Sequence, residues 1–225
     1  MVRGRRGETD KNDGKELKEV FDSIAGDFSE TRSSPWSEVS DFIGGLEGGD
    51  LALDLGCGNG RHLELLAPKF ERAVGVDFSR SMLVEAVKRV SSKPNAELVQ
   101  GDLTCLPFRD SIADSAVYIA ALHHLPTRER RLGSLEDLNR VLKKGGRALI
   151  SVWAIEHTYF DGERDVIRRN GYDIYVPWGS GDEEYERYYH IFNRDNLVSL
   201  LEESPLEVEG VELSSGNYYA RVMRG

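Results

Sequence analysis

The stretch Leu51-Ala52-Leu53-Asp54-Leu55-Gly56-Cys57-Gly58-Asn59-Gly60 decides the fold of this chain. Its first half is a short apolar run, which is typical of a strand buried on both faces of a parallel sheet. Its second half is a glycine-rich turn, where backbone N–H groups can approach a ligand without a Cβ in the way. Helical periodicity resumes at residues 62–66. The stretch therefore predicts the opening strand, turn and helix of a doubly wound α/β sheet.

Strand and helix patterns alternate around this opening unit, which favours the α/β class. Further strands are predicted from apolar runs at residues 73–76, 96–99, 116–120, 147–153, 206–213 and 218–222. Helices are predicted from apolar spacing and caps at residues 17–24, 39–46, 79–90, 132–142 and 196–202. Residues 28–36 are predicted to be a loop, and a tyrosine-rich acidic stretch at 172–189 receives no assignment.

Length and composition are those of one globular domain. At 225 residues the chain fits a single α/β domain over residues 16–225, after a polar, aperiodic and disordered tail at residues 1–15. No apolar run is long enough for a membrane span, and no apolar segment follows the basic N-terminus. We therefore expect a cytoplasmic protein without a membrane anchor.

Cysteine and histidine spacing predicts neither a disulfide nor a metal site. Cys57 and Cys105 are the two cysteines, and the five histidines show no metal-ligand spacing. The net charge of -10 argues against non-specific binding of nucleic acid. However, the charged residues within 123–147 are mostly basic, and those within 182–212 are mostly acidic. The basic segment is either a phosphate-binding face or an ordinary solvated helix face.

The glycine spacing separates two classes of cofactor. The pattern is G-x-G-x-G, whereas a dinucleotide site wants G-x-G-x-x-G, and no P-loop is present. S-adenosylmethionine (SAM) instead requires partners for an ammonium, a ribose diol and an adenine edge. Asp77 ends the second strand and can accept from the ribose hydroxyls, while Asp102 and the Leu103 N–H can bind adenine. Alternatively, Asp77 caps a helix and Asp102 belongs to a turn. The predicted SAM-binding residues are Asp54, Gly56, Gly58, Asn59, Gly60, Asp77, Asp102 and Leu103.

Four motifs in this order resemble those of class I SAM-dependent methyltransferases. They are Asp54 to Gly60, Gly75-Val76-Asp77, Gly101-Asp102-Leu103 and Arg140-Val141-Leu142-Lys143-Lys144-Gly145-Gly146. The resemblance implies SAM as the cofactor. It also implies a seven-stranded sheet in the order 3-2-1-4-5-7-6, with strand 7 antiparallel.

Other segments resemble a narrower family, the tRNA wobble-uridine carboxymethyl methyltransferases, including the methyltransferase domain of the AlkB-type fusion protein. Its carriers are Phe21 to Ala25, Phe28 to Arg32, Pro35-Trp36, Leu122-His123-His124-Leu125, Arg130-Arg131, Val152-Trp153-Ala154, Val176-Pro177-Trp178, Arg187 to Phe192 and Gly216-Asn217-Tyr218-Tyr219. The chain departs from the family at His157, at Ser33-Ser34 and in a shorter insert after Trp178. These departures bear on the fine substrate preference.

The narrower resemblance implies an O-methyltransferase that converts the carboxylate of 5-carboxymethyluridine, at the tRNA wobble position, to its methyl ester. Such a carboxyl group is already ionised at neutral pH, since it titrates near about 4, so no general base is needed. Positioning, charge and base stacking then carry the reaction. The implied catalytic residues are Arg32, His124, Trp153, Arg187, Tyr188 and His190, and Arg128, Arg130 and Arg131 are candidates for phosphate contacts.

The same resemblance implies the anticodon loop of tRNA as a partner, together with a small zinc-ribbon activator subunit that adds a strand to a sheet edge. Structural roles compete for several residues, since Trp153 can be a core residue and Tyr188 can pack in a lid. Two other functions stay open on the sequence: a SAM-dependent methyltransferase of a small carboxylate or quinone metabolite, and a non-catalytic SAM-binding subunit. The tRNA isoacceptors and the oligomeric state stay open as well.

Overall fold

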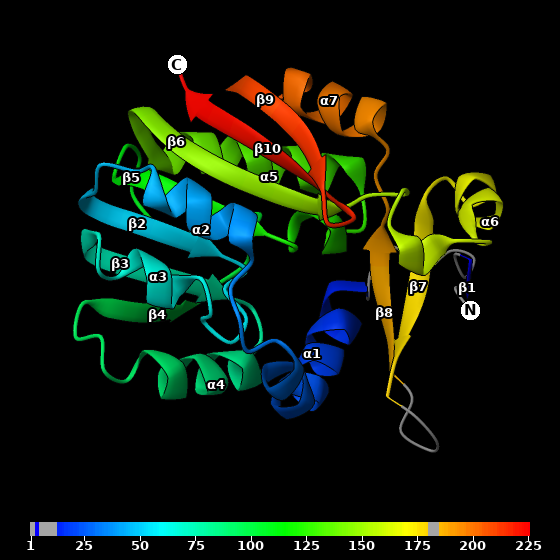
Figure 1. The fold of residues 1–225 in the computed structure, drawn as a ribbon, viewed down its shortest axis with the longest axis horizontal. Coiled ribbons are helices and arrows are strands. Elements are labelled where there is room, and N and C mark those ends of the chain that lie inside the picture. Colours follow the sequence, from blue (N-terminus) through cyan, green and yellow to red (C-terminus); the bar gives the residue numbers. More distant parts are fainter. Residues whose placement is uncertain (1–2, 5–12, 180–184) are drawn as a thin grey trace.

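A computed structural model describes residues 3–4, 13–179 and 185–225, with side chains from residue 16 onward. A seven-stranded sheet forms the body, and a three-stranded sheet lies beside it (Figure 1). The strands are β1 (Arg3–Gly4), β2 (Gly49–Leu55), β3 (Phe70–Asp77), β4 (Ala96–Gln100), β5 (Ala113–Ile119), β6 (Leu142–Trp153), β7 (Asp173–Trp178), β8 (Tyr185–His190), β9 (Leu206–Ser214) and β10 (Asn217–Arg224). The helices are α1 (Asp13–Thr31), α2 (Ser37–Gly44), α3 (Leu63–Leu66), α4 (Arg80–Val90), η1 (Leu122–His124), α5 (Arg128–Val141), η2 (Thr158–Phe160), α6 (Arg164–Arg169) and α7 (Arg194–Glu203).

The large sheet has the order β4-β3-β2-β5-β6-β10-β9. Strand β10 pairs antiparallel with β6 and β9, and the other pairs are parallel. Counted along the chain within this sheet, the order is 3-2-1-4-5-7-6. The expected fold class and the antiparallel seventh strand are confirmed.

Both faces of the large sheet are covered, so its central strands read as continuous apolar runs. Leu51, Leu53 and Leu55 face a core shared with α5 and α7, whereas Ala52 faces a core shared with α2, α3 and α4. The alternation within β2 follows from the two-residue period of a strand. Parallel β2, β3, β4, β5 and β6 therefore end at one edge of the sheet, where the functional residues gather.

Helix α1 and the small sheet β1-β7-β8 stand at that edge, where α1 and β8 line one side of a cavity (Figure 1). The predicted loop at 28–36 was wrong for its first part, because α1 continues to Thr31. The Phe28 ring packs against Trp178 of β7 with 6.0 Å between ring centroids, so a tertiary contact supports this last turn. The hairpin β7–β8 fills the stretch 172–189 that the apolar pattern did not assign, apart from residues outside the described part.

The predicted tail at residues 1–15 lies mostly outside the described residues, apart from β1 and the start of α1, and the tail stays a prediction. Within the described part, no helix is both long enough and apolar enough to cross a membrane.

Candidate functional site

A cavity of ≈ 860 Å³ opens at the carboxyl ends of the parallel strands. We call the side formed by Gly56, Gly58, Asp77, Asp102 and Leu103 the glycine wall. We call the opposite side, formed by Arg32, Trp153, Arg187, Tyr189 and Asn217, the arginine wall. The first comes from the end of β3 and the loops after β2 and β4, and the second from the residue after α1 and from β6, β8 and β10.

The glycine turn is held by Asp77. One carboxylate oxygen of Asp77 accepts from the Gly58 N–H at 2.8 Å, and the other accepts from the Ser79 N–H at 2.9 Å. Burial raises the pKa of Asp77 to about 6, although these two backbone hydrogen bonds lower it. Each carboxylate oxygen keeps a further lone pair, so Asp77 can brace the turn and still accept from a ligand diol.

Backbone conformation explains the glycines at 56 and 58. Both have positive φ, 71° and 52°, which favours glycine. A Cβ on Gly56 would lie 2.4 Å from the Ala121 Cβ, so the turn packs directly on the loop after β5. The two N–H groups that follow β2, those of Gly56 and Cys57, both donate to the Val76 carbonyl. The turn is thus rigid before any ligand binds.

Two of the predicted SAM-binding residues do not line the cavity. Gly60 packs against α4, where a Cβ would lie 3.2 Å from the Ala86 Cβ. Asp54 is buried behind the turn, and its Oδ2 has no hydrogen-bond partner. Burial raises the pKa of Asp54 to about 7, against a backbone hydrogen bond from Leu63 and the charge of Arg61. Both residues support the turn from outside the cavity.

Asn59 connects the two walls. It is 1% exposed, and its amide donates to the Arg32 carbonyl at 3.1 Å and to the Ser29 hydroxyl at 3.3 Å. The glycine turn therefore positions the end of α1 that carries Arg32. Asn59 lines the cavity as predicted, with its amide directed to the protein.

Asp102 and Leu103 line the cavity where adenine is expected. Asp102 Oδ1 accepts from the N–H and hydroxyl of Thr104, both at 2.8 Å. Its Oδ2 lies 4.0 Å from the Arg130 guanidinium. The turn role and the ligand role are therefore compatible, since one oxygen serves each.

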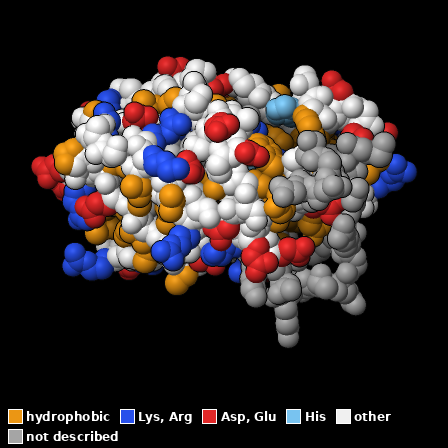
Figure 2. Space-filling view, turned by 90° about the horizontal axis from the view of Figure 1, so that it is seen from below, with side chains coloured by type: hydrophobic (Ala, Val, Ile, Leu, Met, Phe, Trp, Pro, Cys, Tyr) orange, Lys and Arg blue, Asp and Glu red, His pale blue; other side chains and the backbone are white. Residues whose placement is uncertain are grey.

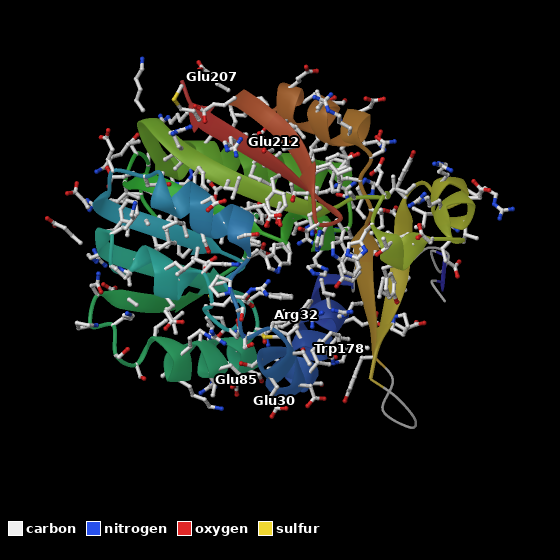
Figure 3. All side chains as sticks on the ribbon, viewed as in Figure 1. Glu30, Arg32, Glu85, Trp178, Glu207 and Glu212 are labelled. Carbon is white, nitrogen blue, oxygen red and sulfur yellow. The ribbon has the colours of Figure 1, made fainter. Side chains whose placement is uncertain are left out.

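The arginine wall contains two guanidinium groups without a carboxylate partner among the described residues. Arg187 is 5% exposed, and its Nε is buried without a hydrogen bond. The Arg187 and Arg32 guanidiniums lie 4.5 Å and 5.2 Å from the Trp178 ring centroid, and Figure 3 shows Arg32 beside Trp178. Burial and the charge of Arg187 lower the pKa of Arg32. A buried and a half-buried positive charge at one place favour an anionic ligand.

Arg61 is a cavity residue that the sequence reasoning missed. It follows the glycine motif directly, is 8% exposed, and stacks 4.8 Å from the Trp36 ring centroid. Burial and the charge of Arg32 together lower its pKa to about 10. Its place next to Gly60 was the available signal.

His124 lines the cavity as a neutral imidazole. Its Nδ1 lies 2.9 Å from the Tyr188 carbonyl oxygen, so Nδ1 carries the proton and donates. Burial lowers the pKa of His124 to about 3. The neighbouring His123 accepts from the Trp153 N–H at its Nδ1, which ties the end of β6 to η1. Positive charge in the cavity therefore comes from arginine and not from histidine.

Aromatic rings cover the arginine wall next to Arg187. Trp153 stacks on Tyr189 with 4.6 Å between centroids and 14° between planes, and Tyr159 stacks on Trp153 at 5.8 Å. The Arg187 guanidinium lies 5.3 Å from the Tyr189 ring. Tyr189, which was not among the predicted residues, therefore belongs to the wall.

Tyr188 and His190 do not line the cavity. Side chains alternate along β8, so these two face away from Arg187 and Tyr189. The Tyr188 hydroxyl donates to Asp173 at 2.6 Å, and His190 Nδ1 lies 2.8 Å from the same carboxylate oxygen. Both residues thus stabilise the small sheet.

The three arginines predicted to contact phosphates lie in different environments. Arg128 pairs with Glu203 at 2.8 Å, and Arg131 is buried and donates to the Leu125 carbonyl. Only Arg130 of the three lines the cavity. Among the described residues no cluster of histidine, cysteine and carboxylate side chains is suited to a metal ion.

Comparisons with known proteins agree on one family. A profile for a methyltransferase domain matches residues 52–146. The tRNA (carboxymethyluridine(34)-5-O)-methyltransferase of Schizosaccharomyces pombe is 32% identical over 206 residues, covering 83% of this chain and 86% of that protein. The Xenopus tropicalis enzyme of the same description, alkbh8, is 40% identical over 154 residues, covering 68% of this chain and 23% of that protein.

Other curated relatives are also longer than this chain, which spans 33% of the Arabidopsis thaliana enzyme and 22% of the Mus musculus enzyme. Two solved structures share the fold. The DhpI-SAM-HEP complex superposes with a TM-score of 0.75 at 18% identity, covering 96% of this chain and 99% of that one. A Haloferax volcanii putative methyltransferase in complex with the Trm112 activator superposes with a TM-score of 0.71 at 16% identity, covering 92% and 97%.

Proposed function

Because this chain belongs to the tRNA (carboxymethyluridine(34)-5-O)-methyltransferase family, we propose that it moves the methyl group of SAM to the carboxylate of 5-carboxymethyluridine at the wobble position of tRNA. The product is the methyl ester. The observation that carries the proposal is the buried Arg187 side chain on the arginine wall, whose Nε has no hydrogen-bond partner. A carboxylate is the anion that such a group binds through two parallel hydrogen bonds.

The glycine wall fits SAM. Asp77 offers acceptors for the ribose hydroxyls at the end of β3, and Asp102 and Leu103 line the adenine end. The cavity of ≈ 860 Å³ is large enough for a cofactor and a flipped nucleoside together. When bound, SAM supplies an electrophilic methyl group on a sulfonium.

The residues of the arginine wall act by positioning. The substrate carboxylate is ionised at neutral pH, so its oxygen needs no base, and neutral His124 is not required to remove a proton. Arg187 and Arg32 hold the carboxylate and orient the attacking oxygen toward the glycine wall. Trp153 and Tyr189 pack against the extruded base and exclude water. Without water, the attraction between the arginines and the carboxylate is stronger, and the attacking oxygen stays aligned with the methyl group.

Radiolabelled transfer tests the proposal. We expect purified protein, incubated with methyl-labelled SAM and bulk tRNA from cells that make 5-carboxymethyluridine, to label the tRNA fraction. Ribonuclease pretreatment should abolish the label, and mild alkali should release it because it is an ester. Label that persists in a small metabolite after ribonuclease would instead identify the metabolite enzyme, and SAM binding without any turnover, even with an activator, would identify the non-catalytic subunit.

We also propose that a small activator subunit, as in the Haloferax volcanii complex, docks at the β4 edge of the large sheet. Helix α4, which packs next to β4, exposes Val84 at 50% and Val87 at 56%. Figure 2 shows hydrophobic side chains among charged ones on the underside of the molecule. The opposite edge strand, β9, carries Glu207, Glu209 and Glu212. Charged side chains on an edge strand disfavour pairing with a further strand.

Co-purification tests the activator. Val87→Asp should abolish the complex with the activator and leave SAM binding unchanged, whereas Val208→Asp on β9 should leave the complex intact. The reverse pattern would place the activator on β9.

The tRNA anticodon loop is the macromolecular partner in the proposed function. Arg130 lines the cavity and is available to contact a phosphate of that loop.

A further inference from the structure

The arginine wall contains a second buried polar group whose partner is not in the protein. Asn217 is 3% exposed, lines the cavity, and has an Oδ1 with no hydrogen bond. A buried amide oxygen without a donor costs free energy unless a ligand supplies one. The carboxylate of the substrate cannot serve, because it has only acceptors.

The orientation of the Asn217 amide is fixed. Its Nδ2 donates to the Ser215 carbonyl at 3.2 Å, so a flipped amide would place two oxygens in contact. The residue follows a two-residue turn in which Ser215 and Gly216 both have positive φ, 50° and 76°. A Cβ on Gly216 would lie 2.3 Å from the His157 ring, so the position requires glycine. Oδ1 is therefore a fixed acceptor.

Other contacts hold the turn in place. Ser214 and Ser215 hydroxyls both donate to Glu38 Oε1, at 2.5 Å and 3.0 Å, and the Ala154 N–H donates to the Gly216 carbonyl at 3.1 Å. Backbone strain that the surroundings over-determine in this way is common at ligand-binding sites. The turn that carries Asn217 is therefore held by side-chain hydrogen bonds, as the glycine turn is held by Asp77.

Asn217 lies beside the aromatic part of the wall. It pairs in register with Trp153 across β10 and β6, and directly opposite residues carry their side chains on the same sheet face. Trp153 in turn stacks on Tyr189, next to Arg187. A flat ring lying along this surface therefore presents one edge to Asn217 and another to Arg187.

We propose that Asn217 is the residue that reads the base, by accepting a hydrogen bond from the uracil N3–H while Arg187 holds the carboxylate on C5. The inference rests on the proposed function and adds to it the basis of selectivity for uracil over cytosine. Uracil has a donor at N3 where cytosine has a lone pair, so cytosine would place an acceptor against the fixed Oδ1. A substrate that leaves a buried polar group of the site unpaired is bound more weakly, so the site discriminates against it.

Two matched RNAs test the proposal. They are anticodon stem-loops with 5-carboxymethyluridine or 5-carboxymethylcytidine at the wobble position, assayed with the full chain and, where needed, its activator. We expect wild-type kcat/KM to favour the uridine by about 10- to 100-fold. Asn217→Ala should lose most of this factor on the uridine RNA and little on the cytidine RNA, so that the ratio falls toward one.

Asn217→Asp keeps an acceptor toward the ligand but places its second oxygen against the Ser215 carbonyl, so it should lower the rate on both RNAs and keep the preference for uridine. Asn170→Ala, which removes an amide that donates to the Val166 carbonyl at the end of α6, should behave as wild type. SAM affinity, measured by calorimetry, should not change in any of the three variants. An unchanged ratio in Asn217→Ala would overturn the inference, and a wild-type enzyme that methylates both RNAs equally would overturn it without any variant. If the wild-type enzyme does not methylate the uridine RNA at all, the proposed function is overturned together with the inference. The other two outcomes overturn the inference alone, so the two failures can be told apart.

Discussion

The two walls of the cavity satisfy their polar groups in opposite ways. On the glycine wall, Asp77 and the glycine turn bond to one another, and the backbone N–H groups of Gly56 and Cys57 find a protein acceptor. On the arginine wall, Arg187 Nε and Asn217 Oδ1 are buried with no partner in the described protein. The first wall is complete by itself, whereas the second is complete only with a ligand. The glycine wall, which we propose binds the cofactor, thus needs no ligand to satisfy its hydrogen bonds, whereas the arginine wall, which we propose binds the substrate, carries an electrostatic cost until a ligand fills it.

This difference predicts that variants of the two walls affect different measured quantities. Substitutions on the arginine wall should lower turnover with tRNA and leave SAM affinity alone. Substitutions on the glycine wall should act on SAM affinity first. Four experiments test the separation.

Arg187→Met should have the largest effect. It removes the charge that holds the reacting carboxylate, so kcat/KM for tRNA should fall by about 100- to 1000-fold, as when one donor to a reacting oxyanion is lost. SAM affinity by calorimetry should stay within about twofold, and thermal stability should not fall, because the lost cation is buried and unpaired. Arg221→Met, at an exposed pair with Glu212, is the control and should leave turnover unchanged. Lower stability in Arg187→Met would show that the guanidinium is satisfied after all.

Asp77→Asn tests the glycine wall. The amide keeps the shape but replaces one acceptor by a donor, so SAM affinity should fall by about 10- to 100-fold. Calorimetric titration measures the affinity. Asp114→Asn is the matched control, because Asp114 accepts from the Leu51 N–H at the other end of the sheet. Equal affinities in both variants would contradict a ligand role for Asp77.

The same wall should respond to pH. Burial raises the pKa of Asp77 to about 6, so protonation below that pH should weaken SAM binding by at most about tenfold per pH unit. Stability should change in the opposite direction. For Asp77 and Asp54 the folded pKa lies above the unfolded value, so their contribution is greatest at low pH and is lost as pH rises through about 6 and about 7.

Urea unfolding of the ligand-free protein measures this second effect. Stability should be higher near about pH 5 than near about pH 8, and Asp77→Asn should reduce the difference. A stability that rises steadily over this range would refute the raised pKa values. The arginine wall should show no such dependence, because arginine keeps its charge throughout.

Tyr188→Phe should have the smallest effect on activity. Its hydroxyl bonds to Asp173 and to the Pro126 carbonyl, away from the cavity. We expect a loss of about 1 kcal/mol in unfolding free energy and a kcat/KM within about threefold of wild type. Tyr189→Ala, one residue further along β8, should lose about tenfold or more in kcat/KM, because Trp153 and Arg187 lose the ring against which both are packed. Equal losses of activity in both variants would contradict the assignment of the two faces.

The contrast between the walls also explains what the sequence could reveal. The glycine wall comes from short segments directly after predicted strands, so its strand, turn and acidic residues were predictable from local pattern. The strand order was implied by the resemblance and is confirmed by β10 lying antiparallel between β6 and β9. Asp54 and Gly60 were placed in the right segment, but which atoms face the cavity depends on packing against α3 and α4.

The arginine wall is assembled from segments far apart in the chain. Arg32 and Arg187 meet on Trp178 because α1 continues into the predicted loop at residues 28–36, as far as Thr31, and because β7 and β8 form a hairpin. Pro177 obscured β7, since proline is unusual inside a strand. Tyr189 and Arg61 were missed because only the phase of β8 and the fold of the loop after β2 bring them to the cavity.

The alternation along β8 also limits how such proteins can vary in length. One face of this strand lines the cavity through Arg187 and Tyr189, while the other contacts Asp173 through Tyr188 and His190. An insertion or deletion of one residue inside β8 would exchange the two faces, and every contact on both would be lost at once. Changes of length beyond Trp178, before the strand begins, leave this phase intact. We therefore expect natural length variation to collect there and to be absent between Tyr185 and His190.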